Sequence, residues 1–363
     1  MALNEQTLTA ALQTVIDPNT GKDFVTTKAL KNLQIQGGDV SFDVVLGYPA
    51  KSQIADFRKA LIAAAKTVAG VDNVSANITV DIVAHAAQRG VALLPQVKNI
   101  IAVASGKGGV GKSTTAANLA LALAAEGAKV GLLDADIYGP SQPMMMGIEG
   151  RPESEDGQTM DPLENYGVQV MSIGFLVDQD EAMIWRGPMA TQALEQLLRQ
   201  TNWKSLDYLI VDMPPGTGDI QLTLSQRVPM TGSVIVTTPQ DIALLDAKKG
   251  IKMFEKVGVP ILGLVENMAV HVCTNCGHVE HIFGADGGKK MAEQYGMDYL
   301  GALPLNMQIR LQADSGKPTV VADPDGEVAT IYKAVARQVA VKIAAKAKDF
   351  SSKFPSIKIS KET

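Results

Sequence analysis

The feature that most limits what this chain can fold into is a glycine-rich run at residues 106–113, GKGGVGKS, which matches the pattern Gly-x-x-x-x-Gly-Lys-Ser/Thr. An apolar stretch at residues 100–104 precedes it, and Ala116, Leu119 and Leu123 follow it at helical spacing. Glycines let the backbone curl, so that its N–H groups and the N-terminus of the following helix face a bound phosphate. The sequence therefore predicts a P-loop between a β-strand and an α-helix.

The predicted P-loop places most of the expected nucleotide contacts in one continuous segment. We expect Lys112 to lie at the β- and γ-phosphates of ATP and the Ser113 hydroxyl to bind Mg²⁺. ATP and Mg²⁺ are the cofactors that follow from these roles. The residues expected to bind nucleotide here are Gly106, Lys107, Gly108, Gly109, Val110, Gly111, Lys112, Ser113 and Thr114.

The second part of the chain contains short apolar runs that each end in polar, glycine or proline residues. Helical stretches separate them. Strands that are buried on both faces of a parallel sheet show this pattern, so we expect a doubly wound, mostly parallel α/β sheet in a P-loop NTPase domain. Ligands of such sheets bind at the carboxyl ends of the strands, where the polar residues gather. The runs are IIAVAS, VGLLDAD, YLIVDMP, SVIVTTP and ILGLVEN.

Acidic residues follow two of these predicted strands. Asp212 has the position of an aspartate that holds Mg²⁺, usually through water, and the loop at 214–219, which includes Gly216, is expected near the γ-phosphate. Asp134 and Asp136 end another strand. A lone acid after a strand is often only solvated, but two such strand ends beside a P-loop favour a shared nucleotide site.

The chain divides into unequal parts. Residues 1–82 are expected to form a small α+β domain, with helices near 7–16 and 52–68 and strands at 40–46 and 74–82. Residues 83–97 look like a linker, residues 98–350 form the predicted P-loop ATPase domain, and residues 351–363 form a tail. Nothing in the side chains of the first domain suggests catalysis.

Charge and hydropathy exclude some classes of function. The formal net charge of −5 is not that of a typical nucleic-acid-binding protein, which is strongly basic. No apolar run is long enough to cross a bilayer, and the first residues lack the pattern of a signal peptide. We therefore expect a cytoplasmic protein with neither nucleic acid nor membrane as a partner.

One short segment contains both cysteines of the chain and most of its histidines, side chains that can bind a metal. Both cysteines, Cys273 and Cys276, and three of the four histidines lie within residues 271–281. A Cys-x-x-Cys pair can direct two thiolates at one metal centre, which is half of a four-ligand site. Either His278 and His281 complete a zinc site within one chain, or a twofold axis brings two more cysteines from a second chain.

The motifs KGGVGKST, DAD and DMPPGTGD resemble those of the deviant-Walker ATPases, which include nitrogenase iron protein, the division-site regulators and the plasmid-partition ATPases. The resemblance implies that Lys107 reaches across a homodimer to the nucleotide of the other subunit. It also implies that Asp136 activates the attacking water. Asn267 and Pro304 are, by the same resemblance, neighbours of the adenine.

A closer resemblance covers nearly the whole chain. The segments LLDADIYGPSQPMMMG, MIWRGPM and VENMAVHVCTNCGHVEHIFG together resemble the Mrp/ApbC family of iron–sulfur cluster carrier ATPases, and the first domain is similar to the small MIP18-type domain that often precedes them. The resemblance implies that Cys273 and Cys276 of two subunits bridge a [4Fe–4S] cluster. Several relatives of the small domain have a cysteine where this chain has Tyr48–Ser52, so a thiolate role for that domain is not supported.

The resulting hypothesis is a homodimeric ATP hydrolase that receives a [4Fe–4S] cluster from an assembly scaffold and delivers it to apo-proteins, with hydrolysis as a conformational switch. Two alternatives remain open. One is an ATPase with a structural zinc at the cysteine pair. The other is a membrane- or DNA-positioning ATPase, for which an apolar stripe with nearby lysines and arginines at the C-terminal helix offers some support.

Overall fold

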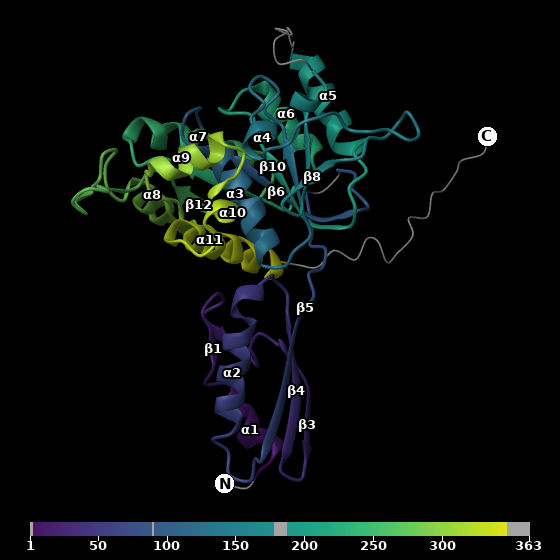
Figure 1. The fold of residues 1–363 in the computed structure, drawn as a ribbon, viewed down its shortest axis with the longest axis vertical. Coiled ribbons are helices and arrows are strands. Elements are labelled where there is room, and N and C mark those ends of the chain that lie inside the picture. The colour runs from purple at the N-terminus through teal and green to yellow at the C-terminus, as the bar shows by residue number, and fades with distance from the viewer. Residues whose placement is uncertain (1–2, 89–90, 178–186, 347–363) are drawn as a thin grey trace.

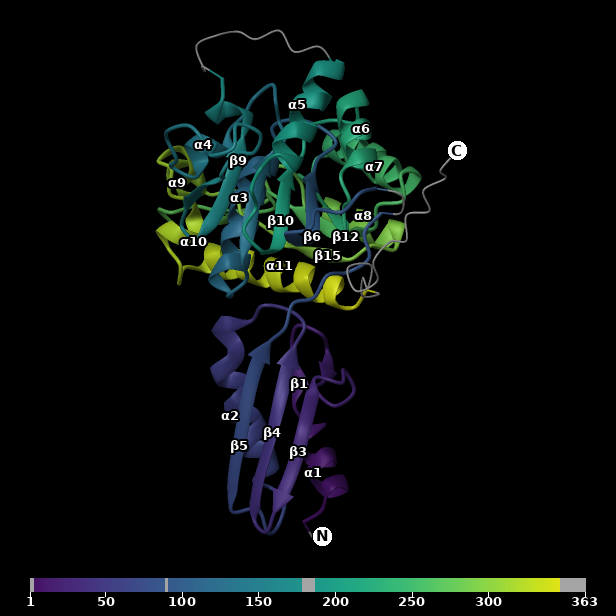
Figure 2. The same ribbon diagram turned by 90° about the vertical axis from the view of Figure 1, so that its right-hand side faces the viewer.

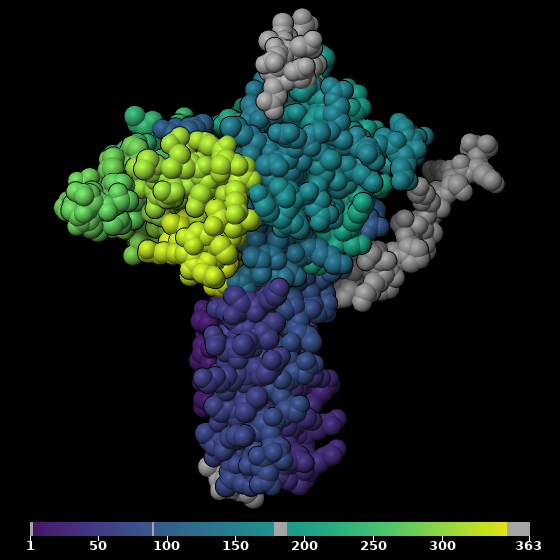
Figure 3. All heavy atoms as spheres, in the orientation of Figure 1, coloured from purple at the N-terminus to yellow at the C-terminus, as the bar shows by residue number. Residues whose placement is uncertain are grey.

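The computed structural model describes residues 3–88, 91–177 and 187–346 of the chain. A small α+β unit forms a narrow body, and a larger α/β unit lies at one end of it (Figures 1 and 3). The first four residues of the predicted motif at 183–189 lie outside the described residues.

The small unit is a three-stranded sheet with helices on one face (Figure 2). In strand β4 (Asp39–Leu46), every second side chain is buried, as expected for a strand with one face on the core. Strand β4 pairs in parallel with β5 (Asn73–Val80) and antiparallel with β3 (Leu30–Gln36). The remaining elements of this unit are α1 (Glu5–Leu12), β1 (Ile16–Asp17), β2 (Lys22–Asp23), the 3-10 turn η1 (Lys51–Gln53) and α2 (Ile54–Ala65).

The first helix begins and ends earlier than the spacing of apolar residues suggests. Asn4 forms a capping box with Thr7, which fixes the N-terminus of α1 ahead of the predicted start. The helix ends at Leu12, and Ile16 lies in β1 with 54% of its surface exposed. The prediction that helix 7–16 includes Ile16 is therefore wrong, because the chain leaves the helix after Leu12 and Ile16 pairs with Asp23 of β2.

The large unit contains an eight-stranded sheet in the order β15-β12-β11-β6-β10-β7-β9-β8. All neighbouring strands are parallel except β8 with β9, which confirms the predicted doubly wound, mostly parallel fold. The apolar runs did not reveal β8, β9 or β15. The strands are β6 (Val97–Ala104), β7 (Val130–Asp134), β8 (Leu163–Asn165), β9 (Val168–Ser172), β10 (Leu206–Asp212), β11 (Gly232–Thr237), β12 (Ile261–Glu266) and β15 (Tyr299–Ala302).

Helices cover both faces of this sheet (Figures 1 and 2). The helix after the P-loop, α3, is nearly all buried. The helices are α3 (Lys112–Ala125), α4 (Gln142–Met145), α5 (Gly187–Arg199), α6 (Asp219–Arg227), α7 (Asp241–Lys256), α8 (Gly287–Tyr295), α9 (Met307–Asp314), α10 (Thr319–Ala322) and α11 (Glu327–Ala344), together with the short turn η2 (Ile173–Phe175).

The last helix packs against the sheet and α3. Tyr332, Val335 and Val339 of α11 are at most 2% exposed, so its apolar stripe is part of the core. Lys342 forms an ion pair with Asp298 at 2.5 Å. Over the three described ranges, no helix has the length and apolarity needed to cross a membrane.

A buried polar network joins the two units. Glu126, at the C-terminal end of α3, forms an ion pair with Arg337 of α11, and both side chains are nearly inaccessible. Ser52 of the small unit donates its backbone N–H and its hydroxyl to the same carboxylate, at 3.0 and 2.7 Å. The Arg337 guanidinium also donates to Asn19 Oδ1 at 3.2 Å. Arg337, one of the basic residues near the apolar stripe of the C-terminal helix, is thus buried in this network.

The network extends into the small unit through Tyr48. Asn19 donates to the Tyr48 hydroxyl at 3.2 Å, and that hydroxyl donates to Asp17 Oδ2 at 2.7 Å. Burial, with the neighbouring Asp17, raises the pKa of Tyr48 far above its usual range. The segment Tyr48–Ser52, which lacks the cysteine of some relatives, therefore contributes to docking between the two units.

Arg337→Met should lower the free energy of unfolding by about 3–5 kcal/mol, because it leaves the Glu126 carboxylate buried without its ion partner. Urea denaturation would measure the loss. Lys342→Met on the same helix is the matched control: its ion pair is exposed, and we expect a loss below about 1 kcal/mol. Equal effects of the two substitutions would contradict an energetic role for the buried pair.

Candidate nucleotide site and cysteine hairpin

Strand order gathers the predicted nucleotide-binding residues at one edge of the sheet. Strand β6, which leads into the P-loop, lies next to β10, and β10 lies next to β7. Asp212 at the end of β10 is in register with Val103 on one side and with Asp134 on the other. The carboxyl ends of these three strands therefore meet, as the sequence predicts.

The P-loop has the tight backbone that its glycines permit. Gly111 has a φ of +81°, and a Cβ there would lie 2.1 Å from Asn267 Nδ2. A Cβ on Gly106 would lie 2.1 Å from the backbone of Asp246 in α7. Lys112 is the first residue of α3, so the N-terminus of this helix faces the loop. The segment fits the phosphate-binding role that its pattern predicts.

Lys112 links the two residues that are expected to hold Mg²⁺. Its Nζ lies 2.5 Å from Asp212 Oδ1 and 3.1 Å from Ser113 Oγ. Lys112 is 5% exposed and Asp212 is fully buried. A hydroxyl and a carboxylate are hard oxygen donors of the kind that Mg²⁺ prefers, and a cation already lies between them. The donor set therefore fits a magnesium ion.

Asp134 organises a loop instead of facing solvent. Its Oδ2 accepts hydrogen bonds from the backbone of Ser141 and of Gln142, both at 3.0 Å, and from Ser172 Oγ at 3.1 Å. Burial, followed by repulsion from Asp212, raises its pKa to about 7. The structure gives Asp134 the role of anchoring residues 134–142, while direct contact with nucleotide stays a prediction.

Asp136 lies in this anchored loop. Its backbone N–H donates to Asp134 Oδ1 at 3.2 Å, and its side chain is half-buried. Burial raises the pKa of the Asp136 carboxyl, while the positive charge of Lys112 opposes this effect. A partly desolvated carboxylate near the P-loop lysine is suited to orienting a water molecule, which is the role that the family resemblance implies.

Two further loops border the P-loop. Gly216 has a φ of +90°, and its N–H donates to the carbonyl of Ser105 at 3.1 Å, so the loop at 214–219 lies against the start of the P-loop. Lys107 is half-buried, and its carbonyl accepts a hydrogen bond from Ser105 Oγ at 2.8 Å. Ser105 is therefore hydrogen-bonded to the backbone of Lys107 and to the loop expected at the γ-phosphate.

The two residues expected beside adenine lie on neighbouring strand ends. Asn267 is 8% exposed, and its Nδ2 donates to the carbonyl of Val110 in the P-loop at 2.8 Å. Pro304 follows Leu303, whose N–H donates to the carbonyl of Glu266 at 2.8 Å. The structure therefore brings Asn267 and Pro304 to the same border of the P-loop, while their contact with adenine stays a prediction.

Two buried polar residues near this edge were missed by sequence reasoning. Gln142 lies between Ser113 and Asp212. The carboxylate of Glu266 accepts the N–H of Gly288 in α8, and burial raises its pKa. Glu266 could have been suspected because it ends an apolar strand directly before Asn267. Gln142 gave no comparable signal.

Both cysteines lie in a small hairpin. Strands β13 (His271–Val272) and β14 (Val279–Glu280) pair antiparallel, and the turn between them carries Cys273 and Cys276. The Cys273 N–H donates to the His278 carbonyl at 2.9 Å, and the Gly277 N–H donates to the Cys273 carbonyl at 2.8 Å. Neither cysteine is in a disulfide, Cys276 is exposed, and Cys273 is partly exposed.

The turn also favours the thiolate form of one cysteine. Backbone hydrogen bonds from Asn275 and then from Cys276 lower the pKa of the Cys273 thiol. These bonds favour the thiolate, which is the form that ligates iron or zinc. The hairpin therefore presents two accessible sulfurs from one tight turn.

The nearby histidines do not join the cysteines. His281 Nδ1 contacts the carbonyl of Ala269 at 2.9 Å, and His278 Nε2 lies 3.6 Å from Glu280 Oε1. In the ranges that the structure covers, no group of three or more His, Cys, Asp or Glu residues is placed to hold a metal ion. The arrangement does not support a four-ligand zinc site built within one chain.

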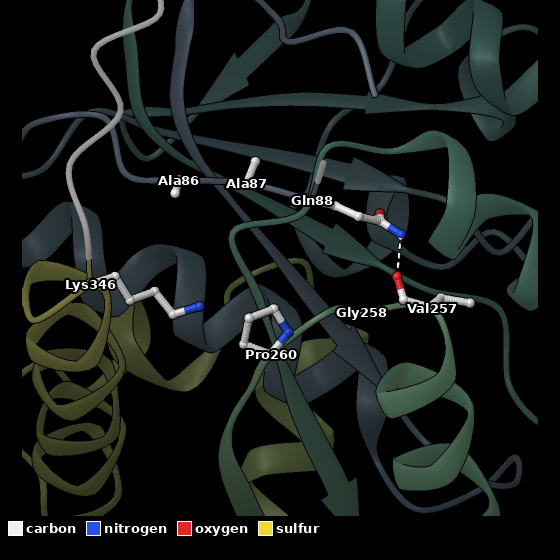
Figure 4. Close-up of a pocket in the computed structure, with 7 residues that line it drawn as sticks. All are labelled: Ala86, Ala87, Gln88, Val257, Gly258, Pro260 and Lys346. Carbon is white, nitrogen blue, oxygen red and sulfur yellow. Dashed lines mark hydrogen bonds between the residues drawn. The ribbon is translucent and has the colours of Figure 1, made fainter. Parts of the chain in front are cut away.

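A cavity of about 490 Å³ lies away from this edge. The residues that border it are Ala86, Ala87, Gln88, Val257, Gly258, Pro260 and Lys346 (Figure 4). Pro260 precedes strand β12, so the cavity lies at the amino ends of the strands, opposite the P-loop. Burial lowers the pKa of Lys346 to about 8, and its ammonium donates to the carbonyl of Thr231. The cavity is not the nucleotide site.

Comparison with protein families identifies both units of the chain. Residues 96–340 match the family described as NUBPL iron-transfer P-loop NTPase. Residues 5–78 match the family described as iron-sulfur cluster assembly protein. The first match covers the eight-stranded sheet and the cysteine hairpin, and the second covers the three-stranded sheet.

Individual proteins agree with these matches. An iron-sulfur cluster carrier protein of Escherichia coli is 51% identical over 90% of this chain and 89% of its own length. The iron-sulfur cluster transfer protein NUBPL of Mus musculus is 56% identical over 67% of this chain and 77% of its own length. A nucleotide-binding protein of Archaeoglobus fulgidus, solved in complex with ADP, is 37% identical, with a TM-score of 0.56 over 64% of this chain and 90% of its own. This chain therefore belongs to the NUBPL-type family of iron-transfer P-loop NTPases.

Proposed function

We propose that this protein is an ATP-dependent carrier that binds a [4Fe–4S] cluster and transfers it to apo-proteins during iron–sulfur protein maturation. The observation that carries the proposal is the hairpin that presents the thiols of Cys273 and Cys276 on the same unit as the P-loop. Relatives named iron-sulfur cluster carrier protein support the choice of cargo. A membrane- or DNA-positioning ATPase would have no use for an exposed thiol pair.

The proposed carrier is a homodimer. Each chain supplies two thiolates, whereas a [4Fe–4S] cubane takes four, so a second copy related by a twofold axis would complete the ligand set. Several large apolar side chains near the P-loop end of the sheet are exposed. Exposed apolar side chains favour a surface that a second chain covers. They include Tyr138, Met144, Ile242, Leu245 and Met307.

In the proposed hydrolysis step, Lys112 leaves Asp212 to contact the β- and γ-phosphates, and Ser113 Oγ and the Asp212 carboxylate would hold Mg²⁺. Bound Mg²⁺ would neutralise phosphate charge and orient the phosphate oxygens. Asp136 orients the attacking water, and its raised pKa makes it a better proton acceptor than an exposed aspartate. Lys107 of the partner subunit would add positive charge at the γ-phosphate.

Backbone hydrogen bonds connect the cysteine hairpin to the segment beside the expected adenine site, so a change at the nucleotide can alter the hairpin. The Ala269 N–H donates to the carbonyl of Leu303 at 3.0 Å, and the Leu305 N–H donates to the carbonyl of Val270 at 2.8 Å. His271 Nδ1 also contacts the Leu305 carbonyl, at 3.1 Å. The strip that leads into the hairpin therefore pairs with the segment that contains Pro304.

We propose that this pairing lets ATP binding or hydrolysis change the geometry of the cluster site. The likeness to carrier proteins further suggests a cluster assembly scaffold as the donor and apo iron–sulfur proteins as recipients. The proposal places the protein in the cytoplasm, with neither nucleic acid nor membrane as a partner.

Asp136→Ala should bind ATP with nearly wild-type affinity and hydrolyse it about 100-fold more slowly or worse, because the water-orienting group is lost while the phosphate loop remains. Equilibrium binding of a fluorescent ATP analogue and steady-state phosphate release would separate the two effects. Lys112→Ala is the contrasting variant, since it should lose most of its affinity for ATP. If both substitutions weaken binding equally, the assigned division of roles is wrong.

Mixing two inactive variants should test whether Lys107 acts across the dimer. Lys107→Ala and Lys112→Ala homodimers should each hydrolyse ATP poorly. A mixed dimer would contain one site with its own Lys112 and the partner's Lys107, so random exchange should restore about a quarter of the wild-type rate. No gain of ATPase activity after subunit exchange, shown by differently tagged chains, would place Lys107 in its own subunit's site.

Anaerobic reconstitution should give brown protein with about four iron and four sulfide per dimer, as one cubane held by four thiolates requires. Cys273→Ser or Cys276→Ser should abolish the cluster and its delivery to an apo-protein, because each change removes two of the four symmetric ligands. Iron and sulfide analysis with visible absorption would measure this. ATPase activity should persist in part, because the P-loop lies on a different strand end.

His278→Ala and His281→Ala are the matched controls in the same hairpin region. Both should retain the cluster, since neither imidazole is grouped with the cysteines. Colourless protein with one zinc per chain, lost on either histidine substitution, would overturn the carrier proposal in favour of a structural zinc.

A further inference from the structure

A buried glutamine occupies a central place between the P-loop and the loop that carries Asp136. Gln142 is the first residue of α4, which lies beside α3 and β9 (Figure 2), and its side chain is 0% exposed. Its backbone N–H donates to Asp134 Oδ2 at 3.0 Å. The anchored loop at 134–142 therefore delivers this side chain into the interior of the nucleotide site.

The side-chain amide of Gln142 touches both elements that are expected to hold magnesium. Its Nε2 donates to Asp212 Oδ2 at 2.9 Å and to the carbonyl of Ser113 at 3.0 Å. Both partners can only accept hydrogen bonds, so they fix which end of the amide is nitrogen. Lys112 bonds the other oxygen of Asp212, so the two side chains together hold that carboxylate on both sides.

The other end of the amide is the unusual feature. Gln142 Oε1 is buried and has no hydrogen-bond partner among the described residues. A buried acceptor without a partner is unfavourable, so such an atom calls for a ligand or a functional reason. Mg²⁺ in nucleotide sites usually keeps several water molecules, and each of these can donate a hydrogen bond. A metal-bound water would satisfy the amide oxygen.

We propose that Gln142 is a positioning residue for the magnesium ion of the ATPase reaction. Its amide nitrogen orients Asp212, and its amide oxygen accepts a hydrogen bond from a metal-bound water. Because the backbone of Gln142 is tied to Asp134, the same residue connects the metal to the loop that holds Asp136. The presence of the metal would thereby set the position of the water-orienting carboxylate.

The test compares how Mg²⁺ changes the affinity for a fluorescent ATP analogue in wild-type protein and in Gln142→Leu, with excess EDTA as the metal-free arm. Gln142→Leu should reduce the Mg²⁺-dependent gain in affinity about tenfold, as expected for one hydrogen bond to a charged partner, and leave the affinity in EDTA unchanged within about twofold. Electron paramagnetic resonance of Mn²⁺ bound with ATP should show the same loss of metal affinity without any turnover.

Gln221→Leu is the matched control. Gln221 is a second buried glutamine, and within the described ranges its side-chain amide forms no hydrogen bond, so it is not hydrogen-bonded to Ser113 or Asp212 as Gln142 is. It should keep the wild-type response to Mg²⁺. If Gln142→Leu does not fold, Gln142→Asn keeps the amide but withdraws it by one methylene, and it should show a smaller loss in the same direction.

The outcomes separate this proposal from the proposed function on which it rests. A wild-type Mg²⁺ response in the folded Gln142 variant, or an equal loss of affinity with and without Mg²⁺, would show that the residue is only a structural tie. Wild-type protein that binds the ATP analogue in neither condition would instead overturn the nucleotide site itself. Cluster binding is measured in neither arm, so the carrier proposal stands or falls separately.

Discussion

The nucleotide site depends on the pairing of three parallel strands, β6, β10 and β7. Their hydrogen bonds fix the register of Asp212 against Val103 and Asp134, residues that lie far apart in the chain. A shift of one residue in β10 would turn Asp212 toward the other face of the sheet, because side chains alternate along a strand. The positions of Lys112 and Ser113 relative to Asp212 therefore depend on this backbone pairing.

The arrangement of the strand ends explains how the nucleotide site and the cysteine hairpin can share one domain without overlapping. The hairpin follows β12, whose last residues lie beside the P-loop through Asn267. Its thiols nevertheless lie in a turn held by its own backbone bonds. Separate local scaffolds let the phosphate loop keep its geometry while a neighbouring segment changes, which is what a carrier that switches between holding and releasing its cargo needs.

Sequence reasoning identified the parts of this site that have a local signature. The P-loop is a contiguous pattern, and Asp212 ends an apolar strand, so both could be placed without a structure. Gln142 could not, because it opens a short helix after an irregular loop and its partner Asp212 lies 70 positions further along the chain. The edge strands β8 and β15 and the neighbouring β9 were missed because pairing with adjacent strands, rather than a long apolar run, defines them, and the start of α1 was misplaced because the Asn4 cap sets it.

The ion pair between Glu126 and Arg337 has a consequence for synthesis on the ribosome. Arg337 emerges 211 residues after Glu126 and 318 residues after Asn19, the partner that it reaches in the small unit. At typical translation rates the first of these intervals lasts roughly 10–40 seconds. During that time the small unit has all of its own strands, while the Glu126 carboxylate to which Ser52 donates still lacks its cation. The first part of the nascent chain should therefore be the last to be fixed in place, as an already folded unit that docks only when the C-terminal helix arrives.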